Sequence, residues 1–190
     1  MTSYLESVRK LFRYYKSLGE KSILQVSDED LFSSRTDNEN SIAVIVKHMH
    51  GNMMSRWTDF LQSDGEKSFR DRDGEFEATI KDREELFQKW EEGWSCVFGA
   101  IDPLDDHQLE QLIYIRNNGH TVLEAINRQL GHYAYHVGQI VVLAKGFHTL
   151  ESWQTLSIAK GQSKKYNNEK FNQKKEKRHF TDEFLKDEKS

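Results

Sequence analysis

Apolar side chains recur three and four residues apart in four separate stretches of this 190-residue chain. On an α-helix such positions form one stripe, whereas a half-buried strand would alternate apolar and polar residues. Pro103 is the single proline of the chain, so long stretches lack a strong helix breaker. The sequence therefore predicts an all-α fold built from amphipathic helices.

The predicted helices begin and end where the sequence supplies capping or breaking residues. Ser41 offers a side-chain N-cap before an apolar run, and the third stripe stops just before Pro103. Gly146 is expected to end the fourth helix. The first stripe covers residues 5–15, and the other helices are expected at about 41–61, 80–101 and 120–146.

A polar stretch from residue 62 to 78 separates the second helix from the third. It contains two Asp-Gly turn signals, at residues 64–65 and 73–74, and it lacks helical periodicity. Four amphipathic helices bury their stripes most simply against one another, and a long connection lets the chain cross along the bundle. We therefore expect a four-helix bundle in which up-down-down-up order is possible, with residues 28–40 forming another polar, turn-rich connection.

The length suits a single domain, and we assign residues 1–160 to the bundle. From residue 161 to 190 lysine and asparagine accumulate and apolar residues become sparse, so a flexible, polar, basic tail is expected. A short helix around residues 181–186 is the alternative for its end.

Charge is unevenly distributed along the chain. The tail carries nine basic and six acidic residues, which leaves 18 basic and 25 acidic residues, a net charge of −7, for residues 1–160. An acidic body argues against nucleic-acid binding as the main task, although the basic tail favours it weakly.

The lone Cys96 cannot form an intramolecular disulfide, and no charged-then-apolar signal segment opens the chain. Both features indicate a reducing, cytoplasmic location. No apolar run approaches membrane-spanning length, so no membrane is expected as a partner. Cys96 lies among apolar residues of the third helix, where a buried, unreactive thiol is expected rather than a nucleophile.

Two histidines of the fourth helix have the spacing of a metal chelate. His132 and His136 are four residues apart, which places their Cβ atoms on one helix face roughly 5–6 Å from each other. The alternative is a pair of half-exposed histidines without a ligand. A third ligand could come from the second helix, which carries His48 and His50.

The residues alone do not decide between His48 and His50. The helical period places His50 nearer the apolar stripe and His48 towards its edge, which favours His50. However, His132 and His136 also lie to one side of their stripe, so a site at the flank of the bundle would suit His48. Both alternatives stay open on periodicity.

Two runs carry a resemblance to a known family: residues 41–48, which end at His48, and residues 131–140, which contain His132 and His136. Together with the crossover loop they resemble the DinB-like (damage-inducible) superfamily, over about residues 2–160, and especially its uncharacterised bacterial members. The resemblance implies an up-down-down-up four-helix bundle, often a homodimer. It also implies a three-histidine metal site and assigns the first ligand to His48.

Three imidazoles and an open position resemble catalytic rather than structural metal sites. The resemblance implies a divalent metal ion, with zinc or nickel as first candidates. It also implies a low-molecular-weight thiol as a possible cofactor, because some DinB-like members transfer such a thiol to an electrophile. A small-molecule substrate would then be the partner. The alternatives are a metal-dependent hydrolase and a non-catalytic, metal-binding stress-response dimer.

Several other residues are candidates for supporting roles. Asn52 and Gln139 could hydrogen bond to the ligands, and Arg116 and His120 could meet an anionic substrate, although an ordinary surface role is the alternative for all four. The acidic cluster at residues 71–75 lacks the full spacing of a calcium loop. The aromatic residues expected in the core, or alternatively in a pocket or dimer interface, are Trp57, Trp90, Trp94 and Tyr133.

Overall fold

The computed structural model describes residues 3–34, 36, 38–149 and 152–185, and most of them are helical. Four helices are long: α1 (Ser3–Ile23), α3 (Ile42–Trp57), α4 (Arg83–Ile101) and α5 (Val122–Gly146). Two are short, α2 (Asp28–Phe32) and α6 (Ser163–Phe171), and single 3-10 turns occur at η1 (Gly74–Phe76), η2 (Asp106–Gln108) and η3 (Phe180–Glu183). The prediction of a mainly helical chain is confirmed.

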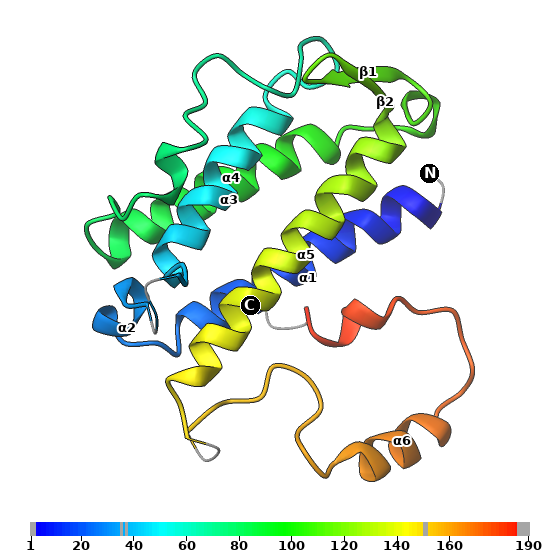
Figure 1. Cartoon of the computed structure of the whole chain (residues 1–190). Helices are drawn as coiled ribbons and strands as arrows, with labels where there is room; N and C mark the ends of the chain where they lie inside the picture. Colours follow the sequence, from blue (N-terminus) through cyan, green and yellow to red (C-terminus); the bar gives the residue numbers. More distant parts are fainter. Residues whose placement is uncertain (1–2, 35, 37, 150–151, 186–190) are drawn as a thin grey trace.

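The long helices share one apolar core. Helix α1 lies beside α5, α3 lies beside α4, and α3 also contacts α5 (Figure 1). The four aromatic residues predicted for the core are all buried there, and Phe12 of α1 makes ring contacts with three of them. No helix among the described residues combines the length and the apolar character that crossing a membrane requires.

Side-chain caps fix where the long helices begin. Ser41 accepts a hydrogen bond from the backbone N–H of Val44 at the start of α3, as the sequence predicted. Asp82 caps α4, which therefore begins at Arg83 rather than at residue 80. At the other end, α3 stops at Trp57 instead of continuing to residue 61, because the chain leaves helical geometry and reaches a positive φ of 46° at Asp59.

A β-hairpin before α5 was not predicted from the sequence. Strands β1 (Leu112–Ile115) and β2 (Asn118–Thr121) pair antiparallel, and the turn between them holds Arg116 and Asn117 at positive φ. The Asp64 carboxylate accepts hydrogen bonds from both turn N–H groups, at 2.8 Å each. The hairpin is therefore tied to the long loop between α3 and α4. Since β2 ends at Thr121, helix α5 begins at Val122 rather than at residue 120.

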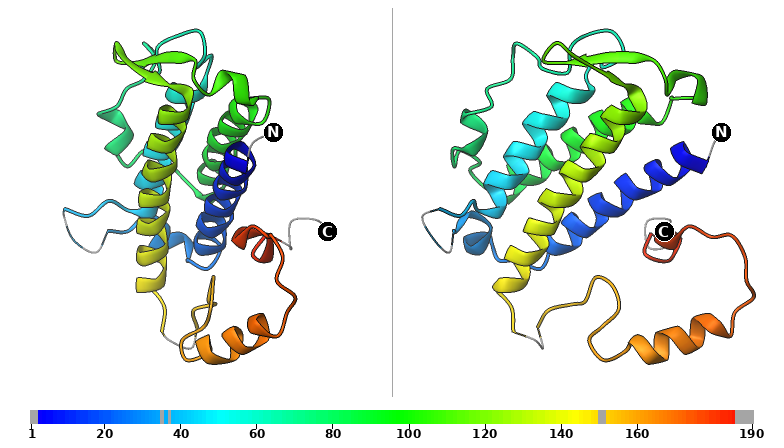
Figure 2. Two further views of the ribbon diagram at one scale, coloured as in Figure 1. Left: turned by 90° about the vertical axis from the view of Figure 1, so that its right-hand side faces the viewer. Right: turned by 45° about the vertical axis from the view of Figure 1, so that its right-hand side comes forward.

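The C-terminal residues contain two helical segments. Figure 2 shows α6 standing away from the four long helices, while η3 lies against α1. Phe180 and Phe184 place their rings 5.5 and 5.6 Å from the ring of Tyr14 in α1. The short turn η3 overlaps the terminal helix that the sequence allowed at residues 181–186. Residue 186 and the residues after it lie outside the described residues. The flexibility of the tail stays a prediction.

The close approach of α1 to α4 depends on Gly19. An alanine Cβ at this position would lie 2.4 Å from Cη2 of the buried Trp90 ring. We predict that Gly19→Ala lowers the free energy of unfolding by about 1–3 kcal/mol through overpacking, measured by urea denaturation.

Gly99→Ala is the matched control for this prediction, because it makes the same change in α4 at a site with open space. There the better helix propensity of alanine should leave stability unchanged or raise it by up to about 1 kcal/mol. Equal stability of Gly19→Ala and the wild-type protein would contradict the proposed contact.

Candidate metal centre

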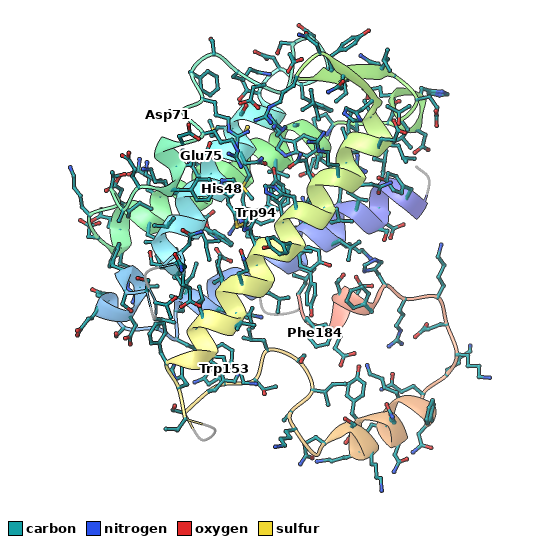
Figure 3. The ribbon with its side chains drawn as sticks, in the orientation of Figure 1. His48, Asp71, Glu75, Trp94, Trp153 and Phe184 are labelled. Atoms are coloured by element: carbon teal, nitrogen blue, oxygen red, sulfur yellow. The ribbon has the colours of Figure 1, made fainter. Side chains whose placement is uncertain are left out.

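Three histidines converge between α3 and α5. His48 comes from α3, and His132 and His136 come from successive turns of α5. Nε2 of His132 lies 3.4 Å from Nε2 of His48 and 3.0 Å from Nε2 of His136, and one ring nitrogen of each residue lies within 4.8 Å of the others. In Figure 3 the labelled His48 lies between the two helices, with Glu75 beside it. These three residues could bind one metal ion.

The structure distinguishes His48 from His50. His48 is 5% exposed and faces α5, whereas Nε2 of His50 lies 3.2 Å from a carboxylate oxygen of Glu92 on α4. His50 therefore lies on the α4 side of α3, outside the cluster. Periodicity left both histidines open with a slight preference for His50, whereas the cluster that the structure forms where α3 meets α5 contains His48.

Two of the histidines have partners that fix the position of their proton. Nδ1 of His48 lies 2.9 Å from Oε2 of Glu75, and an ionised carboxylate can only accept a hydrogen bond. Nδ1 of His136 lies 2.8 Å from Oε1 of Gln139, which is also an acceptor. In the neutral form each ring then carries its proton on Nδ1, and the lone pair of Nε2 faces the cluster.

The arrangement of the nitrogen atoms fits a shared cation. His132 brings a third Nε2 to the same point, while its buried Nδ1 has no hydrogen-bond partner among the residues that the structure describes. A proton on Nε2 of His132 could satisfy only one of the two facing lone pairs. A metal ion would accept all three lone pairs at once, as in three-histidine sites.

Burial favours the neutral, ligand-competent form of the two histidines on α5. Desolvation lowers the pKa of His132 to about 3, with a further contribution from the nearby His136 and His48. Burial also lowers the pKa of His136, although its hydrogen bond with Gln139 opposes this. Both imidazoles are thus neutral near pH 7, which metal binding requires.

An ion-pair network surrounds the partner of His48. Nε of Arg70 donates to Oε1 of Glu75 at 2.7 Å, and Nη2 of Arg70 donates to Oε2 at 3.0 Å. Arg70 also contacts Glu66, which pairs with Arg56 and Arg116. Burial alone would raise the pKa of Glu75, but hydrogen bonds from His48 and Arg70 outweigh it and lower the pKa. Glu75 is therefore ionised near pH 7.

The acidic cluster at residues 71–75 stands out in the sequence, but its spacing does not single out Glu75 as the residue that contacts His48. The carboxylate of Asp71 accepts a hydrogen bond from the backbone N–H of Gly74 and so shapes the turn. Glu75 alone reaches back to a histidine. A signal was available, since a buried histidine ligand commonly bonds a carboxylate, but nothing in the spacing showed which one.

The other supporting candidates separate into two groups. Gln139 contacts His136, as expected of a residue near the ligands. Asn52 instead accepts a hydrogen bond from the hydroxyl of Tyr133, at 3.1 Å. Arg116 lies in the hairpin turn and pairs with Glu66, and His120 of β2 lies 3.4 Å from a guanidinium nitrogen of Arg128. Arg116 and His120 therefore contact other residues than the three histidines.

Aromatic side chains flank the cluster on both sides. The Phe76 ring stacks on His48 at a centroid distance of 4.7 Å and is 39% exposed. Tyr135 of α5 packs edge-on against His136 at 5.0 Å and is 63% exposed. An apolar part of a small molecule that approached the cluster could contact either ring.

Cys96 lies outside the cluster and is half-buried rather than fully buried. Its sulfur lies 3.7 Å from the hydroxyl oxygen of Thr58, and the residue lines a separate cavity of about 340 Å³. Burial raises the pKa of the Cys96 thiol, and the hydrogen bond with Thr58 only partly opposes this. The thiol is therefore protonated near pH 7 and is a poor nucleophile.

This raised pKa predicts slow alkylation of Cys96. At a pH just below 8, iodoacetamide should modify the folded protein more slowly than the same chain in urea, because a raised pKa leaves a smaller fraction of the thiol as the reactive thiolate. Mass spectrometry of quenched samples follows the single cysteine in both states. Equal rates in the folded and unfolded protein would show that Cys96 is accessible and that its pKa is not raised.

Residues 1–162 match the model of a family described as "Protein of unknown function (DUF1572)". That family is part of the DinB-like clan. No curated protein and no solved structure matches the chain.

Proposed function

This chain belongs to the DUF1572 family, and from that premise and the three converging histidines we propose that it is a metal-dependent enzyme. The observation that carries the proposal is the meeting of three Nε2 atoms from two helices. Three protein ligands leave one position of a tetrahedral ion for another molecule, which is typical of catalytic zinc sites. His48, His132 and His136 would hold the ion.

The identity of the ion is the less constrained part of the proposal. Imidazole nitrogen suits zinc, nickel, iron and copper, and the DinB-like resemblance favours zinc or nickel. A bound divalent ion would supply Lewis acidity, which lowers the pKa of a thiol or a water molecule near neutral pH.

The reaction that we propose is the transfer of a low-molecular-weight thiol to an electrophilic small molecule. The thiol would lose its proton to solvent, a sulfur–carbon bond would form, and the bond from that carbon to the leaving group would break, with the electron pair departing on the leaving group. The support is the DinB-like membership together with the raised pKa of Cys96, because the chain's own thiol is unsuited to the attack. Phe76 and Tyr135 would contact the apolar part of the electrophile.

The proposal also covers the arrangement of the four long helices, the domain boundary, the oligomeric state and the location. We interpret α1, α3, α4 and α5 as the up-down-down-up bundle of the DinB-like proteins, supported by the pairing of α1 with α5 and of α3 with α4. Residues 1–160 would form this unit, and the family match over residues 1–162 supports that boundary. A homodimer and a cytoplasmic location are proposed from the resemblance and from the lone cysteine.

Two alternatives make different predictions at the same centre. A metal-dependent hydrolase would use water instead of a thiol, so its turnover of esters or amides would need no added thiol. A non-catalytic metal-binding dimer would gain stability from the ion without any turnover.

The metal site is tested by elemental analysis of the purified protein. We expect about one divalent ion per chain in the wild-type protein, and loss of most of it in His132→Ala, because two imidazoles and a vacancy replace the three-ligand set. His50→Ala is the control on α3 and should keep the ion, since His50 contacts Glu92 and lies outside the cluster. Equal metal content in all three proteins would contradict the site.

The reaction class is tested with metal-loaded protein and a panel of electrophiles, each with and without a low-molecular-weight thiol. We expect conjugation that needs the thiol, disappears with a chelator and falls at least about a hundredfold in His132→Ala. Chelator-sensitive turnover of esters or amides without thiol would favour the hydrolase. Absence of turnover, with a lower melting temperature for His132→Ala, would favour the non-catalytic reading.

A further inference from the structure

Glu75 lies outside the three-histidine set, in the loop that joins α3 to α4. We propose that Glu75 is a positioning residue that fixes the tautomer and orientation of His48, and that Arg70 holds Glu75 in place for this task. The inference rests on the proposed metal site and deepens it. It makes the loop from residue 70 to 77 part of the metal centre.

The first support is the chain of contacts from Arg70 to the cluster. Oε2 of Glu75 accepts from Nδ1 of His48 at 2.9 Å, and both Glu75 oxygens accept from Arg70. The Glu75 and Arg70 side chains are only 6% and 2% exposed. A buried carboxylate that bonds both a histidine and a guanidinium cannot turn away without leaving charges unpaired.

The second support is that α3 leaves space for the Glu75 carboxylate. Gly51 lies three residues after His48, and a Cβ there would lie 2.3 Å from Oε1 of Glu75. The ammonium group of Lys47 bonds the backbone carbonyls of Gly74 and Glu77, at 2.5 and 3.0 Å. Lys47 and Gly51 are four residues apart, so one face of α3 both holds the turn that carries Glu75 and leaves room for its side chain.

The third support is that the next residue, Phe76, restricts the orientation of the His48 ring. Phe76 stacks on the face of His48, with an interplanar angle of 26°, while Glu75 bonds its edge at Nδ1. Together the two residues leave Nε2 as the ring atom that faces His132. Outer partners of this kind fix the tautomer and orientation of histidine ligands and raise their basicity.

The purely structural alternative is an ion pair that only stabilises the loop. It predicts that removal of the Glu75 charge lowers thermal stability but leaves metal affinity unchanged. Metal affinity and the tautomer of His48 therefore separate the two roles.

The test measures zinc affinity of the full chain by competition with a chromophoric chelator. Glu75→Gln should lower the affinity about 10- to 100-fold. Glu92→Gln is the matched control, because it removes the carboxylate from His50 and leaves the cluster untouched, and its affinity should equal that of the wild-type protein. Unchanged affinity in a folded Glu75→Gln protein would overturn the inference.

A double variant covers the case in which Glu75→Gln fails to fold because Arg70 loses its partner. Arg70→Met with Glu75→Leu removes both charges and the acceptor for Nδ1 of His48, so that no buried charge is left unpaired. Its zinc affinity should also be about 10- to 100-fold below that of the wild-type protein. Wild-type affinity in the double variant would contradict the positioning role.

A second readout needs no metal. In long-range ¹H–¹⁵N spectra of metal-free wild-type protein, His48 should appear as the Nδ1–H tautomer. The double variant, in which residue 75 offers Nδ1 no acceptor, should populate the Nε2–H form. An Nε2–H tautomer in the wild-type protein would overturn the inference. If the wild-type protein binds neither zinc nor another divalent ion, the proposed function fails, whereas this spectrum still decides the role of Glu75.

Discussion

The packing of α3 against α5 is the contact on which the candidate centre depends, because each helix supplies part of one ligand set. Tyr133 fixes this packing from within the core. Its hydroxyl accepts a hydrogen bond from Nε1 of Trp57 at 2.9 Å and donates one to Oδ1 of Asn52 at 3.1 Å, and the residue is 0% exposed. Both partners belong to α3, and Tyr133 itself is the immediate neighbour of His132 in α5. A rotation of α5 would break both buried hydrogen bonds of Tyr133. These bonds therefore fix the packing of the core and also orient His132 toward His48.

The long loop between α3 and α4 does more than connect the two helices, because one of its residues contacts a histidine of the candidate centre. Its Asp64 carboxylate caps the hairpin turn, Glu66 pairs with Arg56, and Glu75 reaches His48. Buried charges are costly unless they are paired, and here each carboxylate has a basic or amide partner. A polar loop of this composition would be expected to remain solvated. Its ordered form instead depends on partners in α3 and in the hairpin, which are distant in sequence.

More of the fold than of the candidate site could be predicted from local sequence signals. Ser41 could be predicted as a cap and Trp94 as core, because capping chemistry and the helical period act within a few residues. The hairpin was missed because its turn is set by the distant Asp64, and because neither short strand alternates apolar and polar residues: β1 is apolar or aromatic throughout, and β2 is polar. Spacing found His132 and His136, but the choice of His48 over His50 depends on which face of α3 meets α5. Glu75 could not be assigned, since its partner lies 27 positions away in the chain.

A crystal structure with diffraction data from both sides of the absorption edge of the bound metal tests the central claim most directly. The account predicts one anomalous peak within about 2.0–2.1 Å of Nε2 of His48, His132 and His136 if the ion is zinc, with Nδ1 of His48 still bonded to Glu75. A metal-loaded crystal in which the three rings point apart, or in which the anomalous peak lies at other residues, would contradict it.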